Sequence, residues 1–358
     1  MKSIRRFYLV SALSFLTLTL CIAQEEEAVI PTKEITALNT PIKSLDFTLS
    51  GSVDAYFRGN FNSTYDDAPA TSFANLPGFA LGMANIIASF EGDKVGFTAD
   101  LVFGPRGEDA TFLSPFLRPG GSSNILNQLF VYLKASDAVT FTLGNFNTFL
   151  GYEVISPTGN FNYSTSYMFS YGPFSHTGLK MDADLGNGFS LMLGVFNPTD
   201  VTEFNLTNDY FGGAQLGYSY DAGSLYLNSL FGDGYFQVDL TAGFDVTDVL
   251  YLGINATTTQ TEDDIADFSG IAGYIQAEAS DNVKLGLRAE YFKDDGIGAI
   301  APGENVFDIT LSSNITVGTF GSLTLIPEIR MDFLSFDGFN GGEDSSLASF
   351  ALAAVYGF

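Results

Sequence analysis

Apolar and polar side chains alternate at every second residue over most of the chain beyond residue 44. In "LDFTLSGSVDAYFR" (45–58), one face carries Leu, Phe, Leu, Val, Ala and Phe, and the other carries Asp, Thr, Ser, Ser, Asp, Tyr and Arg. The same split recurs in 95–103 and 283–291. A period of two indicates β-strands with one apolar face. The pattern therefore predicts an all-β protein.

Following this alternation along the chain predicts about sixteen strands, bounded by turn residues. Their approximate spans are 45–59, 79–91, 95–104, 126–135, 139–149, 175–185, 188–197, 209–221, 223–232, 235–246, 249–259, 268–280, 282–293, 305–317, 321–333 and 347–358.

The connections between these strands alternate in length. Short turns such as "GDK", "ASDA" and "SDN" alternate with longer Gly- and Asp-rich segments, and one short outer connection, "FGDGY", breaks the rule. Up-and-down hairpins place all turns of one class at one end of a sheet, as in bacterial outer-membrane barrels. A soluble sandwich with Greek-key crossings gives no reason for this asymmetry.

The sequence ends on "SLASFALAAVYGF", an apolar strand face that runs to the last residue. A sheet of sixteen strands rarely stays open, and an unpaired backbone row in hydrocarbon is prohibitively costly. We therefore predict a transmembrane antiparallel up-and-down β-barrel. Such a final strand is also the signal that barrel precursors present to their assembly machinery. The predicted barrel-closing residues are Phe350, Leu352, Tyr356 and Phe358.

The chain divides into three predicted parts: a signal peptide (1–23), a periplasmic leader (24–44) and the outer-membrane barrel (45–358). Three basic residues precede the apolar run "FYLVSALSFLTLTL", as in a secretory signal. Acylation of Cys21 is the alternative, but Leu20 fits the lipoprotein pattern poorly. Removal of the signal removes the only cysteine, so the mature chain has no intramolecular disulfide.

Composition agrees with a barrel in lipid. Only 16% of residues are charged, against about 25% in soluble chains, and no apolar stretch beyond residue 22 is long enough for a spanning helix. Without the three basic residues of the signal, the formal charge changes from −26 to −29. This charge argues against nucleic acid as a partner.

Charges within the strands follow the polar phase, which would face the lumen. Of twelve basic residues in the mature chain (fifteen minus three), seven take this phase or its immediate continuation. Opposite charges across a narrow passage would order water, whereas charges that pair would only brace the lumen. The predicted pore-lining residues are Arg58, Asp100, Arg106, Lys134, Lys180, Asp182, Asp184, Lys284, Arg288, Glu290, Glu328, Arg330 and Asp332.

No catalytic or cofactor motif is present. His176 is the only histidine, no G-x-S-x-G elbow occurs, and there is neither a phosphate-binding glycine loop with a following Lys nor a Cys or His cluster for a metal. We interpret His176 as a structural hydrogen-bonding residue between a loop and the barrel wall. We therefore predict that the protein is not an enzyme and has no cofactor.

The segment "FTLGNFNTFLGYEVISPTGNFNYSTSYMFSYGPFSHTGLKM" (141–181) resembles the signature region of the OmpL-like β-barrel porin family, and "PEIRMD" and "LGLRAEYFKDD" are also similar. The resemblance implies an outer-membrane porin of Gram-negative bacteria that passes small hydrophilic solutes. Family members often have Arg between two serines where this chain has Thr165. This departure puts a transferred anion preference in doubt.

Within that segment, 150–174 is a long connection rich in aromatic residues and Asn. Loops of this length are usually functional, and in general porins a loop at this place folds inward. The hypothesis is that it forms the constriction. The predicted constriction residues are Tyr152, Glu153, Asn160, Asn162, Tyr163 and Tyr167.

The predicted function is a water-filled channel in the cell outer membrane for passive diffusion of small hydrophilic solutes and ions. A substrate-selective channel, a non-conducting adhesin or structural barrel, and a barrel hydrolase are the alternatives. Expected partners are membrane lipid and lipopolysaccharide, the barrel-assembly machinery and small polar solutes. A homotrimer is usual for sixteen-stranded general porins, although nothing in the sequence marks a subunit interface.

Overall fold

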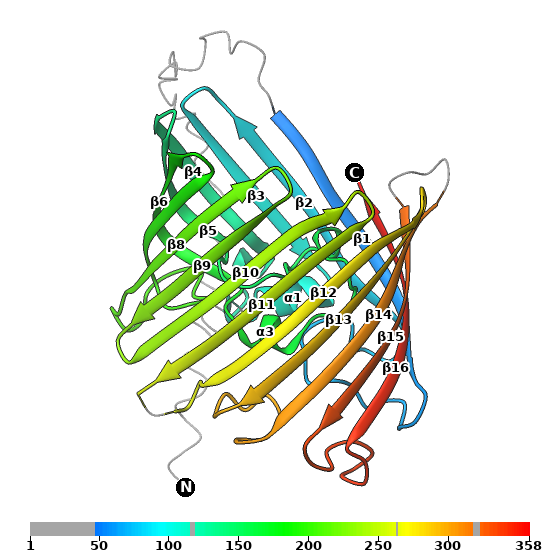
Figure 1. Cartoon of the computed structure of the whole chain (residues 1–358). Helices are drawn as coiled ribbons and strands as arrows, with labels where there is room; N and C mark the ends of the chain where they lie inside the picture. Colours follow the sequence, from blue (N-terminus) through cyan, green and yellow to red (C-terminus); the bar gives the residue numbers. More distant parts are fainter. Residues whose placement is uncertain (1–46, 115–118, 263, 318–322) are drawn as a thin grey trace, which may run out of the picture. The chain divides into compact units, whose positions relative to one another are not determined.

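The structure, a computed structural model, describes residues 47–358 except 115–118, 263 and 318–322, and its strands form one closed antiparallel barrel (Figure 1). The strands are β1 Phe47–Asn60, β2 Gly78–Glu91, β3 Val95–Phe103, β4 Leu126–Ser136, β5 Val139–Asn147, β6 Ser175–Gly186, β7 Phe189–Phe196, β8 Phe211–Tyr220, β9 Gly223–Gly232, β10 Tyr235–Thr247, β11 Leu250–Thr261, β12 Phe268–Ser280, β13 Val283–Asp294, β14 Asn305–Thr316, β15 Leu323–Leu334 and β16 Ser346–Gly357. The predicted fold class is confirmed. The predicted signal peptide (1–23) and the predicted leader (24–44) lie outside the described residues.

Pairing between the first and last strands closes the barrel. β1 and β16 run antiparallel from Ser52 opposite Gly357 to Asn60 opposite Ser349, and they lie side by side as the blue and red strands of Figure 1. Beyond this register, Gly51 and Phe358 exchange two backbone hydrogen bonds of 3.0 Å. The predicted closing strand thus leaves no free edge between β1 and β16.

The two faces of the strands separate as the alternation predicts. On β1 the outward side chains of Leu49 and Val53 are 59% and 47% exposed, whereas the inward side chains of Ser52 and Arg58 are 1% and 3% exposed. On β14, Leu311 is 50% exposed and its neighbour Thr310 is fully buried. The outer surface is therefore apolar, which is the condition for contact with lipid.

Among the described residues, α-helices and 3₁₀ turns occur in two of the long connections. The connection after β3 contains α1 (Pro105–Ala110) and the 3₁₀ turn η2 (Ser122–Ile125), and the connection after β5 contains η3 (Pro157–Gly159) and α3 (Tyr167–Tyr171). Figure 1 shows α1 and α3 enclosed by the strands. None of the described helices has the length and apolar character needed to cross a membrane.

Candidate functional site

The connection 148–174 between β5 and β6, here called the inner loop, folds back into the barrel and binds its inner wall. At its start, the Gly151 N–H donates to the Asp239 carboxylate on β10 at 2.9 Å. The ring of Tyr152 stacks on Tyr274 of β12, with centroids 4.1 Å apart. The Tyr152 hydroxyl donates to the Tyr251 hydroxyl on β11 at 2.9 Å. The first turn of the loop is therefore anchored to three neighbouring strands.

Two wall carboxylates hold the main chain of the inner loop. Glu328 on β15 accepts hydrogen bonds from the N–H groups of Tyr163 and Ser164 at 2.8 and 3.1 Å. Glu290 on β13 accepts from the next pair, Tyr167 and Met168, at 2.7 and 2.8 Å. This second pair begins α3, where unpaired N–H groups favour a negative charge. Each carboxylate thus fixes two consecutive peptide groups.

Two arginines on the same wall bind the loop from its carbonyl side. Arg288 donates to the Ser164 carbonyl at 2.8 Å, and Arg330 donates to the Thr165 carbonyl at 2.7 Å. Both guanidinium groups also pair with Asp308, which lies between them on β14, at 3.1 and 3.2 Å. Arg288 further pairs with Glu153 of the loop. These side chains are at most 5% exposed, so they form a dry, charge-paired contact.

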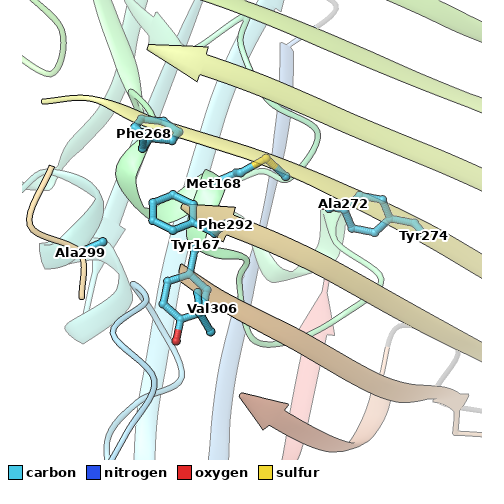
Figure 2. Close-up of a cluster of buried hydrophobic side chains, with 8 residues drawn as sticks. All are labelled: Tyr167, Met168, Phe268, Ala272, Tyr274, Phe292, Ala299 and Val306. Atoms are coloured by element: carbon cyan, nitrogen blue, oxygen red, sulfur yellow. The ribbon is translucent and has the colours of Figure 1, made fainter. Parts of the chain in front are cut away.

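Apolar packing completes this contact. Tyr167 and Met168 of α3 pack against Phe268, Phe292 and Val306 of the wall (Figure 2). The Tyr167 ring lies 5.6 Å from that of Phe292, and the Tyr167 side chain is fully buried. Burying aromatic surface between a loop and a sheet stabilises the folded position of the loop. The loop is therefore held by both charge and packing.

The inner loop also contacts the other side of the barrel. The Tyr163 hydroxyl donates to Asp54 on β1 at 2.5 Å. Arg106 donates to the Ile155 carbonyl at 2.9 Å, and its guanidinium carbon lies 4.6 Å from the centroid of the Phe73 ring. Arg106 belongs to α1, so its expected place in the continuation of a strand was wrong. The loop therefore joins β1 and α1 to the wall formed by β13–β15.

The predicted pore-lining residues fall into two groups. Arg58, Asp100, Arg106, Arg288, Glu290, Glu328, Arg330 and Asp332 are at most 3% exposed. The inner loop, the connection after β1 or neighbouring wall residues cover these side chains. Lys134, Lys180, Asp182, Asp184 and Lys284 keep contact with solvent.

In the exposed group, Lys180 pairs with Asp182 at 2.9 Å and Lys284 pairs with Glu278 at 2.6 Å. Among the deep charges, Arg288, Arg330 and Asp332 belong to the charge-paired contact on β13–β15, whereas Asp100 bonds to the amides of Asn85, Asn127 and Gln128. Whether either group lines the conducting path stays a prediction.

The predicted constriction residues do not all reach the wall. Tyr152, Glu153, Tyr163 and Tyr167 make the contacts described above, and Asn162 donates to Ser312 on β14 at 2.7 Å. Asn160 instead bonds to the backbone of Val154 within the loop. Their role in setting the bore stays a prediction.

Two wall residues that matter here were missed as candidates. Asp308 lies in register between Glu290 and Asp332 and pairs with both arginines. Its polar phase in "NVFDITLS" was visible in the sequence. Asp54, which binds Tyr163, was likewise visible on the polar face of β1 but was not singled out.

His176 on β6 is fully buried between the rings of Phe149 and Phe196, each 5.0 Å away. Its Nε2 lies 2.9 Å from the Thr148 hydroxyl at the start of the inner loop. This contact links loop and wall. Within the described ranges, no group of three or more His, Cys, Asp or Glu side chains is placed to hold a metal ion.

Solved structures of outer-membrane porins share this architecture. *Salmonella typhi* OmpF, solved with daunomycin, superposes with a TM-score of 0.60 at 13% identity over 87% of this chain and 97% of its own. *Pseudomonas putida* OprB gives 0.59 at 14% over 88% and 94%, and an anion-selective porin from *Comamonas acidovorans* gives 0.57 at 13% over 88% and 100%. At such identities the likeness establishes the fold. No curated protein matches the sequence.

Membership of a family rests on the sequence itself. The family described as "Putative beta-barrel porin-2, OmpL-like" matches residues 46–358, which include every strand of the barrel and the inner loop. This match confirms the resemblance noted in 141–181. The chain belongs to this family of OmpL-like β-barrel porins, and it is an outer-membrane channel.

Proposed function

We propose that the inner loop sets the bore of this channel, so that small hydrophilic solutes and ions pass by diffusion and no reaction takes place. The observation that carries the proposal is that two wall carboxylates, Glu328 and Glu290, each accept hydrogen bonds from two consecutive backbone N–H groups of the loop. Because the bonds are made by the main chain, they hold the backbone of the loop in place independently of the conformations of the loop's side chains. A loop held in this way would narrow the lumen as a rigid element and would not open and close.

The contacts on both sides of the barrel support the same reading. The inner loop reaches Asp54 through Tyr163, and the wall of β13–β15 through Arg288 and Arg330. Hydrogen bonds to charged groups contribute more than those between neutral groups, roughly 1.5 to 3 kcal/mol each. Together with the packing of Tyr167 and Met168, they offset part of the entropy lost on ordering the loop.

The test is the single-channel conductance of Glu328→Gln in planar bilayers. The amide keeps the size of the side chain but loses the charge that binds two N–H groups. We expect a larger or flickering conductance because this part of the loop is released. Deletion of 155–170 should raise the conductance further. Unchanged conductance in both variants would contradict the proposal.

Glu278→Gln is the matched control. Glu278 also lies in the barrel, on β12, but it pairs with the exposed Lys284 and makes no hydrogen bond to the inner loop among the described residues. Its replacement should leave the conductance of the open channel steady. Heat-dependent gel mobility would establish that each variant retains a folded barrel.

We also propose the partners that a porin of this family needs: lipid and lipopolysaccharide around the apolar outer face, and the assembly machinery at the final strand. A homotrimer is the proposed assembly. Chemical cross-linking in native outer membranes, followed by mass measurement in detergent, tests it. A monomer in both measurements would dismiss the trimer without affecting the channel.

A further inference from the structure

A recess of about 230 Å³ opens beneath the first turn of the inner loop, against the wall of β8–β11. Its lining includes Tyr152 from the loop and Tyr226 and Tyr251 from the wall, together with Gln215, Ser224 and Thr241. None of the described lining residues is charged. This wall differs from the β13–β15 wall, which carries the buried arginines and carboxylates.

Glycines on the wall shape this recess. A methyl group on Gly243 would lie 1.9 Å from the Tyr251 hydroxyl oxygen, and one on Gly253 would lie 2.7 Å from the Tyr152 hydroxyl oxygen. The two glycines face each other in the β10–β11 ladder. A methyl group on Gly217 would likewise lie 2.8 Å from the Tyr226 ring. The tyrosines therefore rest on bare backbone, where any larger residue would push them into the lumen.

Hydrogen bonds orient three of the polar side chains of the recess, those of Tyr152, Tyr251 and Gln215. The Tyr152 hydroxyl donates to that of Tyr251, so the proton of the Tyr251 hydroxyl is free to bond elsewhere. The Gln215 amide group donates to the Phe149 carbonyl at 3.2 Å and to Asn228 at 2.8 Å, which fixes the side chain at the edge of the recess. Aromatic faces beside hydroxyl and amide groups suit a ligand with both an apolar face and a polar rim.

From this arrangement we propose that the recess is a binding subsite for a neutral saccharide ring on its way through the channel. The carbon-bound hydrogens of a sugar ring make an apolar face that packs on tyrosine, and its hydroxyl groups exchange hydrogen bonds with Tyr251, Ser224 and Thr241. The inference rests on the proposed channel function, because the sugar must enter the lumen to reach the recess.

Electrostatics disfavour anionic solutes at this position. Two carboxylates flank the recess along β10: Asp239 is 1% exposed and already accepts hydrogen bonds from Gly151, Asn228 and Asn255, whereas Asp245 is exposed and lies opposite Tyr251. An anion in the recess would lose water without meeting a positive counter-charge, which costs free energy. A neutral ring loses only hydroxyl hydration, which the recess replaces. The subsite therefore favours sugars over their acidic derivatives.

The experiment compares glucose with sorbitol, a neutral polyol of the same carbon number that has no ring. Saturation-transfer NMR on the detergent-solubilised protein measures binding, and the K⁺ current through single channels measures block. We expect a saturable response to glucose and a much weaker one to sorbitol. Tyr226→Ala should weaken glucose binding roughly threefold to tenfold, because it removes one aromatic contact.

Tyr218→Ala is the control, since Tyr218 lies on the same β8–β9 hairpin but on the outer face, where it is 38% exposed. It should bind glucose as the unmodified protein does. Equal responses to glucose and sorbitol, or a Tyr226→Ala variant with unchanged binding, would overturn the subsite. The absence of any K⁺ current would instead refute the channel function, and the NMR measurement would still decide the subsite.

Discussion

Arg288 on β13 donates to Glu153 of the inner loop at 2.8 Å, which joins two residues that are 135 positions apart in the sequence. The Arg288 side chain is fully buried and that of Glu153 is 5% exposed. A buried charge without its partner is costly, so neither residue tolerates loss of the other. This pair ties the position of the loop to the integrity of the barrel wall.

Arg288→Met should lower the free energy of unfolding by about 3 to 5 kcal/mol, because it leaves Glu153 buried without its cation and leaves Asp308 with only one of its two. Urea unfolding of the protein in detergent, followed by gel mobility, measures this change. Lys284→Met is the control on the same strand. Lys284 and Glu278 are about half exposed, and such pairs contribute about 1 kcal/mol or less. Equal losses in the two variants would contradict the prediction.

Leu311→Arg on β14 should destabilise the barrel in lipid by roughly 2 to 4 kcal/mol if the side chain lies near the bilayer midplane. Leu311 is 50% exposed on the outer face, where an arginine would meet hydrocarbon. Asn314→Arg on the same strand has the inward phase and should cost less. Unfolding of both variants in lipid vesicles measures the difference. A smaller loss for Leu311→Arg than for Asn314→Arg would mean that the faces are assigned the wrong way round.

Contact between two outer connections should depend on pH through Asp67. The hydroxyl of Ser63 and the Asn340 N–H both donate to its carboxylate and hold the pKa of Asp67 below its usual value of 3.8. A lowered pKa means that this contact stabilises the protein above pH 3.8 and is lost as the pH falls through the pKa of the folded protein. Hydrogen exchange in 335–345 should therefore gain an additional acceleration as the pH falls below 3.8.

Asp67→Asn serves as the reference for this effect. The variant has no carboxylate to titrate, so exchange in 335–345 should lack the additional acceleration at low pH. If the unmodified protein and the variant respond to acid in the same way, Asp67 does not control the contact.

Removal of Phe358 should impair assembly in cells more than folding in vitro. In the folded barrel the residue supplies two backbone hydrogen bonds to Gly51, worth roughly 0.5 to 1.5 kcal/mol each. That loss of free energy is small compared with the total contribution of the hydrogen bonds between sixteen paired strands. If the assembly machinery recognises the final aromatic residue, the amount of protein in the outer membrane should fall severalfold, while refolding into detergent micelles stays nearly complete. Parallel losses in both assays would argue against recognition.

Local sequence was sufficient to predict the strands, because apolar and polar residues alternate with a period of two within each of them. All sixteen predicted spans correspond to observed strands, with ends that differ by a few residues at most. The pairing of β1 with β16 also followed, since a long sheet with one apolar face has to remove its edges. The inward phase of Arg288 and Arg330 followed from the same alternation.

What those inward charges contact was decided by tertiary structure alone. The alternation places Arg288, Glu290 and Asp308 on one face, but it contains nothing about a loop more than a hundred residues earlier in the chain. Glu290 and Glu328 accept hydrogen bonds from backbone N–H groups, which every residue except proline carries. These bonds therefore cannot be predicted from the side chains in 160–170. The tyrosine recess likewise depends on glycines from separate strands. Periodicity is a property of neighbours in sequence, whereas the path of the inner loop depends on which distant groups the closed barrel brings within hydrogen-bonding distance.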